Sequence, residues 1–382
     1  MPIRPIRPSD FDALNRLHRQ VGWPERSQAG WRWLDENPAR LFSGAPSGWV
    51  VADEADAPVA MLGNFVQRFH HGPRILHGAT GFSIIVPPEQ KGASRGLINT
   101  FVKQQGMFAR YTLNANARSA PLYPKFGMTP FPVETANVKL SWIVDKLACA
   151  KGRMLRKLFG GLSASAATRL GEQLMNRRLF RPEPLKLAAD IAPLRDLSDR
   201  SEYADFWRDL VAEGHLLADR SPAMMRWRMS DPDQTVRPLL LGLRRNGRIV
   251  GVAMASMGKN NLIEPPCLDI LDLAALKSAP EAIEVLAAAL VANARGMGAA
   301  KVRLQVVTPE LLESLGALAA TARREGGWGH GHAVIDEPEL ASAWAPTPFD
   351  GDYAICNRPT PLSARKRRAQ VQATPQGRLS KA

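Results

Sequence analysis

The first part of the chain carries apolar runs of strand length, separated by residues that favour turns. The turn-forming stretch EADA at 54–57 joins two of these runs, which predicts a β-hairpin. The expected strands cover residues 3–7, 48–53, 58–69, 77–86, 111–116 and 133–144. We expect the last of them to close the first sheet.

Helical periodicity appears between these strands. Residues 9–23 predict a helix that begins at Ser9, because a serine N-cap precedes an acidic first turn. Residues 97–109 carry apolar side chains at helical spacing, and 119–126 predict a short helical turn. The order predicts an α/β fold, of the α+β type with a mixed sheet, in which a helix crosses between two neighbouring strands.

A second copy of this plan occurs later in the chain. Trp33 and Pro38 recur as Trp227 and Pro232, in both cases 194 residues further on, and a hairpin pattern follows at 239–257. Two unrelated α/β domains are the alternative, but the shared order of strand, helix, Trp-Pro unit and hairpin favours duplication.

The duplication divides the chain into two tandem domains and two basic segments. We expect a first domain at 1–145 and a degenerate second domain at 189–356. Residues 146–188 are expected to form a basic, partly helical linker, and 357–382 a basic disordered tail.

Composition and charge indicate which partners and which cellular compartment to expect. The chain has 382 residues, 45% of them hydrophobic, and a formal net charge of +14, which favours anionic partners such as nucleotides or nucleic acid. Its three cysteines have neither redox nor metal-ligand spacing, which predicts no disulfide and no zinc site. The N-terminus lacks a signal-peptide pattern and the longest apolar run, 285–292, is too short to span a bilayer. We therefore expect a cytoplasmic protein.

The stretch VPPEQKGASRG at 86–96 is the strongest candidate for a ligand site. Pro87 and Pro88 cannot donate to a sheet ladder, so the strand must part from its neighbour there. A glycine-rich turn then opens a helix, where unpaired amides and the helix dipole favour an anion such as a diphosphate. A plain connecting turn is the alternative for an isolated match.

Residues 1–145 resemble the GNAT superfamily of N-acyltransferases. Val86 and Pro88 are similar to the family's V-x-P strand end, and 91–96 to its Gln/Arg-x-x-Gly-x-Gly/Ala loop, although Lys91 and Ser94 depart from the pattern. Residues 114–128 are similar to the Asn-x-x-Ala-x-x-Leu-Tyr-x-Lys-x-Gly-Phe segment of the family. The resemblance implies acetyl-CoA as co-substrate. The implied cofactor contacts are Ile85, Val86, Lys91, Gly92, Ala93, Ser94, Arg95, Gly96 and Asn116.

Acyl transfer to an amine needs a base, an oxyanion donor and an acid for the departing thiolate. The resemblance places Tyr123 as the acid, with packing under the short helix as the alternative, and Asn116 either contacts the cofactor or caps a turn. The expected strand carboxylate is missing from 77–86. The remaining polar candidates for the base, directly or through a water, are His70, His71, His77, Thr80 and Ser83.

The second copy differs where the first has its loop. Glu281 and Glu284 stand near the corresponding helix start, where they would repel a diphosphate, so we expect no CoA there. Asp269 and Asp272 are interpreted as solvent-facing strand carboxylates rather than amine contacts. His330 and His332 are interpreted as a polar turn rather than a metal site.

These patterns predict an N-acetyltransferase whose second domain shapes the site for an amine acceptor, either a small molecule or a protein. Two alternatives stay open: a Fem-like transferase that uses aminoacyl-tRNA, and a non-catalytic pair that binds CoA or a partner. Nucleic-acid binding has little support, because only 7% of residues are aromatic and no recognised motif is present. The oligomeric state does not follow from the sequence.

Overall fold

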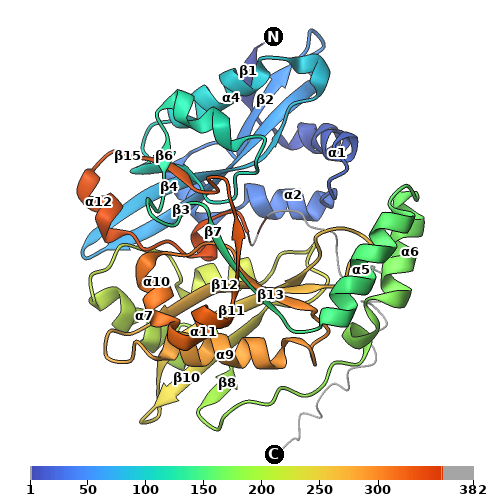
Figure 1. Ribbon diagram of the computed structural model, residues 1–382. Coiled ribbons are helices and arrows are strands. Elements are labelled where there is room, and N and C mark those ends of the chain that lie inside the picture. Colours follow the sequence, from blue (N-terminus) through green and yellow to red (C-terminus); the bar gives the residue numbers. More distant parts are fainter. Residues whose placement is uncertain (1, 354, 356–382) are drawn as a thin grey trace, which may run out of the picture.

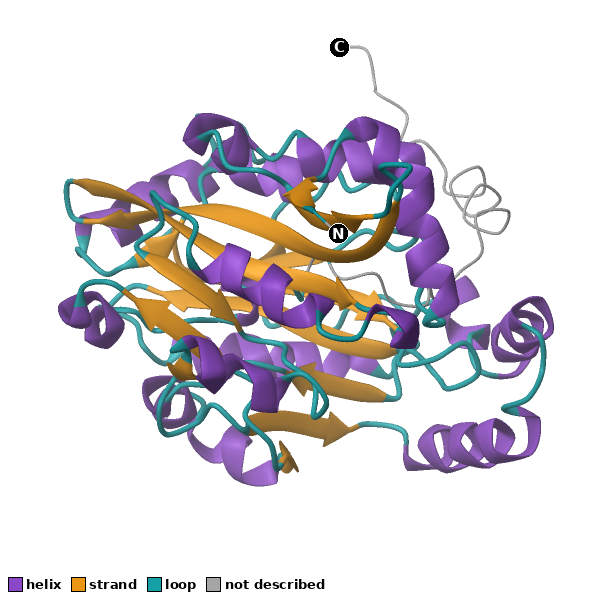
Figure 2. Cartoon of the chain, turned by 90° about the horizontal axis from the view of Figure 1, so that it is seen from above, coloured by secondary structure: helices purple, strands orange, loops and turns teal. Residues whose placement is uncertain are grey.

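The computed structural model describes residues 2–353 and 355 and contains two β-sheets, each built mainly from one half of the chain. Figure 1 shows the first sheet in the upper part of the molecule and the second in the lower part. The view in Figure 2, turned by 90°, shows helices around the strands of both sheets. The predicted α/β fold with mixed sheets is confirmed. The predicted tail at 357–382 lies outside the described residues.

The first sheet has one parallel pair, β4 with β5, and its other neighbours are antiparallel. In spatial order its strands are β1 (Ile3–Pro5), β2 (Gly48–Ala52), β3 (Pro58–His71), β4 (Arg74–Ile85), β5 (Ala109–Thr112), β15 (His332–Ile335) and β6 (Thr129–Pro130), with β9 (Leu217–Ala218) beside β3. The expected hairpin joins β2 and β3 around Asp56, which has a positive φ of 58°.

The second sheet repeats this order, with its own parallel pair, β12 and β13. Its strands are β8 (Ile191–Pro193), β10 (Leu239–Arg245), β11 (Arg248–Gly258), β12 (Cys267–Ala275), β13 (Lys301–Leu304), β7 (Val138–Ile143) and β14 (Arg323–Gly326). The matching order supports the predicted duplication.

The two halves exchange one strand. β7 comes from the first half but lies in the second sheet between β13 and β14, and β15 comes from the second half but lies in the first sheet between β5 and β6. The expectation that residues 133–144 close the first sheet was therefore wrong. Leu140 and Trp142 alternate correctly for a strand, but they are buried in the core of the second sheet. A period of two fixes which face is buried and not which sheet the strand joins.

Helices cover the faces of both sheets. Those of the first half are α1 (Phe11–Gln20), α2 (Gln28–Asp35), α3 (Pro38–Ser43) and α4 (Ala93–Val102), with the 3₁₀ turns η1 (Pro8–Asp10), η2 (Pro88–Gln90) and η3 (Ala120–Phe126). Those of the second half are α7 (Glu202–Ala212), α8 (Pro222–Arg228), α9 (Ala282–Ala294), α10 (Pro309–Ser314), α11 (Gly316–Thr321), α12 (Pro338–Ala343) and η5 (Pro348–Asp350).

The connecting stretch between the halves contains α5 (Lys146–Phe159), α6 (Ala164–Leu174) and η4 (Arg177–Phe180). In Figure 1, α5 and α6 lie beside each other at one side of the molecule. Within residues 2–353 and 355, no helix is both long and apolar enough to cross a membrane.

One apolar core spans both halves. It includes Leu97 and Phe101 of α4, Phe206 of α7, and Trp344 and Phe349 near the end of the described chain. A second core lies between the second sheet and α9, and a third lies under α1 and α2 against the first sheet. The shared core and the exchanged strands hold the first sheet in a fixed position relative to the second half.

Candidate acyl-transfer site

The parallel pair of the first sheet is short. β4 pairs with β5 only from Gly78 to Thr80, opposite Ala109 to Tyr111. β4 then continues to Ile85 with β3 on its other side, while no described strand pairs with it on the β5 side. Pro87 and Pro88 follow at once and have no amide hydrogen to extend a ladder. Backbone groups of β4 beyond Thr80 are therefore available to a ligand that runs along this edge.

A bulge interrupts β4 in this unpaired part. The register against β3 shifts between Phe82 and Ile85, and Ser83, inside the shift, has a φ of 47°. A residue with a side chain adopts this left-handed conformation at a cost of order 1–3 kcal/mol, and such positions concentrate at functional sites. The bulge turns the Ser83 hydroxyl to a hydrogen-bonding distance of 3.3 Å from Nε2 of His18.

His18 reaches this hydroxyl from α1. It is 1% exposed, and its Nδ1 lies 2.9 Å from the carbonyl oxygen of Leu14. A carbonyl can only accept, so Nδ1 carries the proton and Nε2 is left to accept from Ser83. Burial, and secondarily the charge of Arg26, lower the pKa of His18 below its ordinary value, although the bond to Leu14 opposes this. The pair thus presents a neutral imidazole behind a serine hydroxyl.

The start of α4 lies just beyond the end of β4. Gly92 occupies its N-cap position with a φ of 92°, and no side chain caps the first amides. A Cβ atom placed on Gly92 would have nothing within 4 Å, so this turn faces open space. Lys91 and Arg95, on either side, are exposed. Unpaired amides at the positive end of a helix dipole, with two cations beside them, suit a phosphate group.

Two of the expected cofactor contacts have structural roles of their own. A Cβ atom on Gly96 would lie 2.7 Å from Cδ1 of Ile3, so this glycine allows α4 to pack on β1. The side-chain oxygen of Asn116 accepts hydrogen bonds from the amides of Arg118 and Ser119 at 3.0 and 2.9 Å. Asn116 therefore caps the turn that leads into η3, as the alternative interpretation had it.

Tyr123 lies on η3 and is 6% exposed. Burial raises the pKa of its phenol to about 12, while hydrogen bonding to the side chains of Ser119 and Thr112 opposes the shift. The phenol is therefore protonated at neutral pH, as a proton donor must be. Tyr123 also belongs to the large apolar core, so both of its expected roles are compatible with its position.

The second half of the chain lines the segment that follows β5. Nε1 of Trp328 donates to the carbonyl of Ala115 at 3.1 Å, and the amide of Ala115 donates to the carbonyl of His330 at 2.9 Å. The ring of His332 lies 5.4 Å from the ring of Tyr123. These contacts follow directly from the strand exchange, because β15 begins at His332.

The other candidate bases lie elsewhere. His70, His71 and His77 stand at the far end of the β3–β4 hairpin, and His77 precedes Ser83 by six residues, about 20 Å along a strand. Thr80 is fully buried, and its hydroxyl has no hydrogen-bond partner in the described part of the chain. Ser83 differs from these residues because its hydroxyl lies 3.3 Å from a ring nitrogen of His18. His18 was missed, because a single histidine on an amphipathic helix gives no signal in the sequence.

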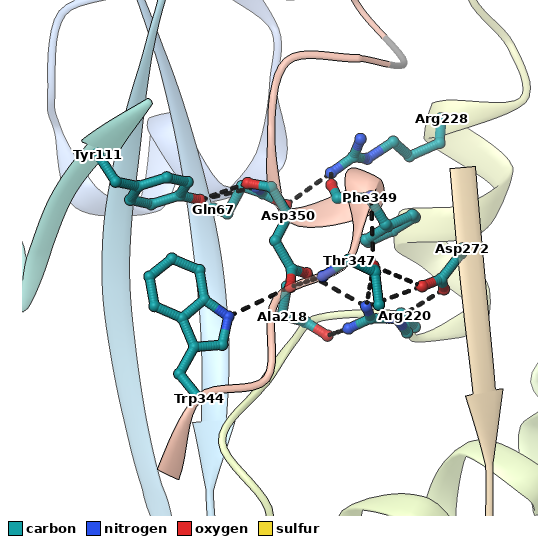
Figure 3. Close-up of polar contacts among 10 residues, drawn as sticks. All are labelled: Gln67, Tyr111, Ala218, Arg220, Arg228, Asp272, Trp344, Thr347, Phe349 and Asp350. Atoms are coloured by element: carbon teal, nitrogen blue, oxygen red, sulfur yellow. Dashed lines mark hydrogen bonds and ion pairs between the residues drawn. The ribbon is translucent and has the colours of Figure 1, made fainter. Parts of the chain in front are cut away.

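The equivalent place in the second sheet is filled by the chain itself. β12 leaves β13 after Ile270, and Asp272, just beyond, binds Nε of Arg220 at 2.7 Å and the hydroxyl of Thr347 at 2.8 Å. Arg220 also reaches Asp350 at 3.2 Å. Figure 3 shows these residues as one network at the junction with the first sheet.

The interpretation of Asp269 and Asp272 as solvent-facing was wrong. Both are buried, 5% and 2% exposed, and each is bound by an arginine. Arg303 binds Asp269 through Nε at 2.6 Å and through Nη2 at 2.8 Å. The carboxylates lie inward because each has a guanidinium to offset the cost of burial. No cluster of three or more metal-binding side chains occurs within the described residues.

No family model and no curated protein matches the sequence. Solved structures do match it. A conserved protein of unknown function from Enterococcus faecalis V583, a probable N-acyltransferase, is 8% identical with a TM-score of 0.50, covering 88% of this chain and 73% of its own. A GCN5-related N-acetyltransferase from Anabaena variabilis is 15% identical, with a TM-score of 0.48 and coverages of 88% and 73%. N-myristoyltransferase from Saccharomyces cerevisiae with bound myristoyl-CoA is 10% identical, with a TM-score of 0.49 and coverages of 87% and 76%.

At these identities the likeness concerns the fold, for which the Enterococcus protein is the nearest of the three. The chain has the fold of this probable N-acyltransferase, and each of its two sheets has the same strand order.

Proposed function

We propose that this protein is an N-acyltransferase that moves the acyl group of an acyl-CoA thioester onto a primary amine. The observation that carries the proposal is the course of β4. It loses its β5 partner after Thr80, and from its end at Ile85 the chain passes through η2 to the uncapped start of α4. This combination supplies an edge for an extended amide-containing carrier and, at its end, a seat for a diphosphate.

The diphosphate binds at the amides of Ala93 and Ser94, where Lys91 and Arg95 add positive charge. The pantetheine arm runs along the free edge of β4, with the amides of Ile85 and Val86 as hydrogen-bond donors. This path brings the thioester to the bulge at Ser83. Acetyl-CoA is the proposed donor.

The reaction joins the amine nitrogen to the thioester carbon. The attacking amine loses a proton to the Ser83 hydroxyl, which passes its own proton to Nε2 of His18, 3.3 Å away. An amide of the free β4 edge stabilises the oxyanion. The carbon–sulfur bond then breaks, sulfur keeps the electron pair, and the phenol of Tyr123 protonates it to give free CoA. His18 returns its proton to solvent, and Tyr123 takes one up.

The acceptor enters from the side lined by the second half of the chain. Trp328 and His330 adjoin the segment after β5, so the second half can shape the acceptor site without binding CoA itself. The acceptor is a primary amine on a small molecule or a protein.

Calorimetric titration with acetyl-CoA and with desulfo-CoA tests the binding step. Ser94→Asp is the informative variant, because an acidic residue in the first turn favours the helix but repels a diphosphate. We expect its affinity for both ligands to fall at least about tenfold. Ser94→Asn is the matched control, with similar size and no charge, and should bind nearly as wild type.

An amine screen that detects the released CoA thiol tests turnover. Thiol release that depends on an amine and disappears in Tyr123→Phe supports the proposal. Absence of CoA binding in the wild type, or equal binding by wild type and Ser94→Asp, would overturn it. Binding to tRNA that weakens steeply with salt, without CoA binding, would favour the aminoacyl-tRNA alternative.

A further inference from the structure

Helix α5 exposes a row of large apolar side chains to solvent. Leu147, Met154 and Leu158 are 82%, 56% and 65% exposed. They follow one another at spacings of seven and four residues, which places them on one side of the helix. Phe159 and Leu162, at the turn into α6, extend the row with exposures of 40% and 42%. We call these five residues the apolar row.

The apolar row is separate from the surface by which α5 packs on the protein. Leu155 is buried with Ala167 of α6 and Ile263 of the loop before β12. A Cβ atom on Gly152 would lie 2.5 Å from Pro265, so the helix is held close to this loop. The packing of α5 and α6 is thus complete without the apolar row. An exposed apolar surface of this kind lowers solubility, and the apolar row has no partner among the described residues.

The same hairpin is strongly basic. Residues 146–171 contain no aspartate or glutamate. Their cations are Lys146, Lys151, Arg153, Arg156, Lys157 and Arg169, all exposed. Glu172, near the end of α6, is buried. Of the carboxylates around the hairpin, Glu264 pairs with Arg156, and Asp145 pairs with Arg178 and Arg295.

Charge also argues against an occupant from this chain. Residues 356–382 carry seven Lys and Arg and no acidic residue, so they would be repelled by the hairpin. A second copy of the chain would bring the same positive surface to the contact. The partner must be apolar and anionic at once, over an area wide enough for two neighbouring helices.

We propose that the α5–α6 hairpin docks on the surface of an anionic phospholipid bilayer. The apolar row enters the boundary between headgroups and acyl chains, and the surrounding lysines and arginines lie at the level of the lipid phosphates. α5 lies in the plane of the surface and does not cross it. In Figure 1 the hairpin forms one side of the described part of the molecule.

Co-sedimentation of the full chain with lipid vesicles tests the proposal. We expect binding to vesicles of phosphatidylcholine with phosphatidylglycerol, little binding to phosphatidylcholine alone, and release of the protein by about 0.5 M salt because the charges are then screened. Leu147→Ser with Leu158→Ser should reduce binding at least about tenfold, as should Lys151→Glu with Lys157→Glu.

Matched control variants distinguish binding through the hairpin from non-specific binding of exposed apolar or basic side chains elsewhere on the protein. Leu41→Ser with Phe42→Ser removes side chains that are 59% and 75% exposed on α3, and Lys103→Glu with Lys125→Glu reverses two exposed charges of the first half. Both controls should bind vesicles within about twofold of wild type, since they leave the hairpin unchanged.

Other outcomes overturn the proposal. One is equal binding to neutral and anionic vesicles, and another is an equal loss of vesicle binding in the control variants. A third is a wild type that does not bind vesicles but self-associates in ultracentrifugation, with Leu147→Ser and Leu158→Ser together abolishing the self-association. Binding to RNA with no binding to vesicles would also overturn it. Vesicle binding does not require turnover, so this test is independent of the acyltransferase assay.

Discussion

Trp33 and Trp227 stack on each other, with ring centroids 4.3 Å apart and an interplanar angle of 9°. Nε1 of Trp33 also donates to the carbonyl of Trp227 at 2.9 Å. The two tryptophans are the same position in the two copies of the repeat, so the duplicated residue meets its own counterpart. Arg26 binds Asp231 at 3.1 Å beside them and ties the halves together further.

Because of this stack, a substitution of Trp33 tests how much the contact between the two halves contributes to stability. Trp33→Ala removes a buried ring and the hydrogen bond, and we expect the free energy of unfolding to fall by about 3–5 kcal/mol. Urea denaturation followed by circular dichroism measures the change. Trp23→Ala, at a site 39% exposed, is the control and should cost less than about 1 kcal/mol. If Trp33→Ala and Trp23→Ala lowered the free energy of unfolding equally, the stack would not contribute more to stability than an exposed tryptophan.

The buried network of Figure 3 predicts a second loss of stability. Asp272→Asn leaves Arg220, itself 3% exposed, without the carboxylate that binds it through two nitrogens. Arg220 keeps Asp350 at 3.2 Å, so we expect the loss of one of its two carboxylates to lower the free energy of unfolding by about 1–3 kcal/mol. The exposed pair of Asp205 and Arg208 is the control, because Asp205→Asn should cost less than about 1 kcal/mol. The same denaturation measurement applies, and a small effect at Asp272 would contradict the argument.

The protonation of His18 predicts how kcat/KM changes on the acid side of its pH profile. A base must be unprotonated, and burial lowers the pKa of His18 from its ordinary value, so kcat/KM should fall only below about pH 6.5. His18→Gln should lower kcat about 10²–10⁴-fold and remove this limb. His71→Gln, at the far end of the β3–β4 hairpin, should leave kcat and the acid limb of the pH profile unchanged. If the limb persists in His18→Gln, another group is the base.

His330 predicts a pH dependence of stability. Burial, with a smaller contribution from the nearby charge of Lys139, lowers the pKa of this imidazole to about 4. The unfolded chain takes up a proton below about pH 6.5 while the folded chain does not, so stability is full above that pH and falls as the pH drops toward 4.

His330→Gln measures this contribution. The free energy of unfolding of wild type should fall by up to about 3 kcal/mol more than that of the variant between pH 6.5 and 4. Comparison with the variant is needed because other buried histidines act in the same direction. Parallel pH curves for the two proteins would contradict the assignment.

The sequence predicted what depends on neighbouring residues. The hairpin around Asp56 and the turn glycine at Gly92 follow from local backbone chemistry. The strand parts from β5 already after Thr80, earlier than Pro87 and Pro88 predict. The repeat of Trp33 in Trp227 was visible for the same reason, since it needs only a comparison of one stretch with another.

What the sequence did not predict depends on distant contacts. Val138–Ile143 has the pattern of a strand, but nothing in that pattern distinguishes the first sheet from the second. Asp272 has the composition of a surface carboxylate until Arg220 is brought beside it from 52 residues away. His18 acquires its role only because a bulge turns Ser83 toward α1.

The exchange of β7 and β15 has a consequence for synthesis on the ribosome. The first sheet lacks an interior strand until residue 335 has been made, so the first 145 residues emerge with β5 and β6 unjoined. Chaperones, or the nascent chain itself, must keep that exposed edge from pairing with other polypeptides for the time that nearly two hundred further residues take to appear. The arrangement is also what fusion of two genes would leave if the ancestral protein had been a dimer with swapped strands.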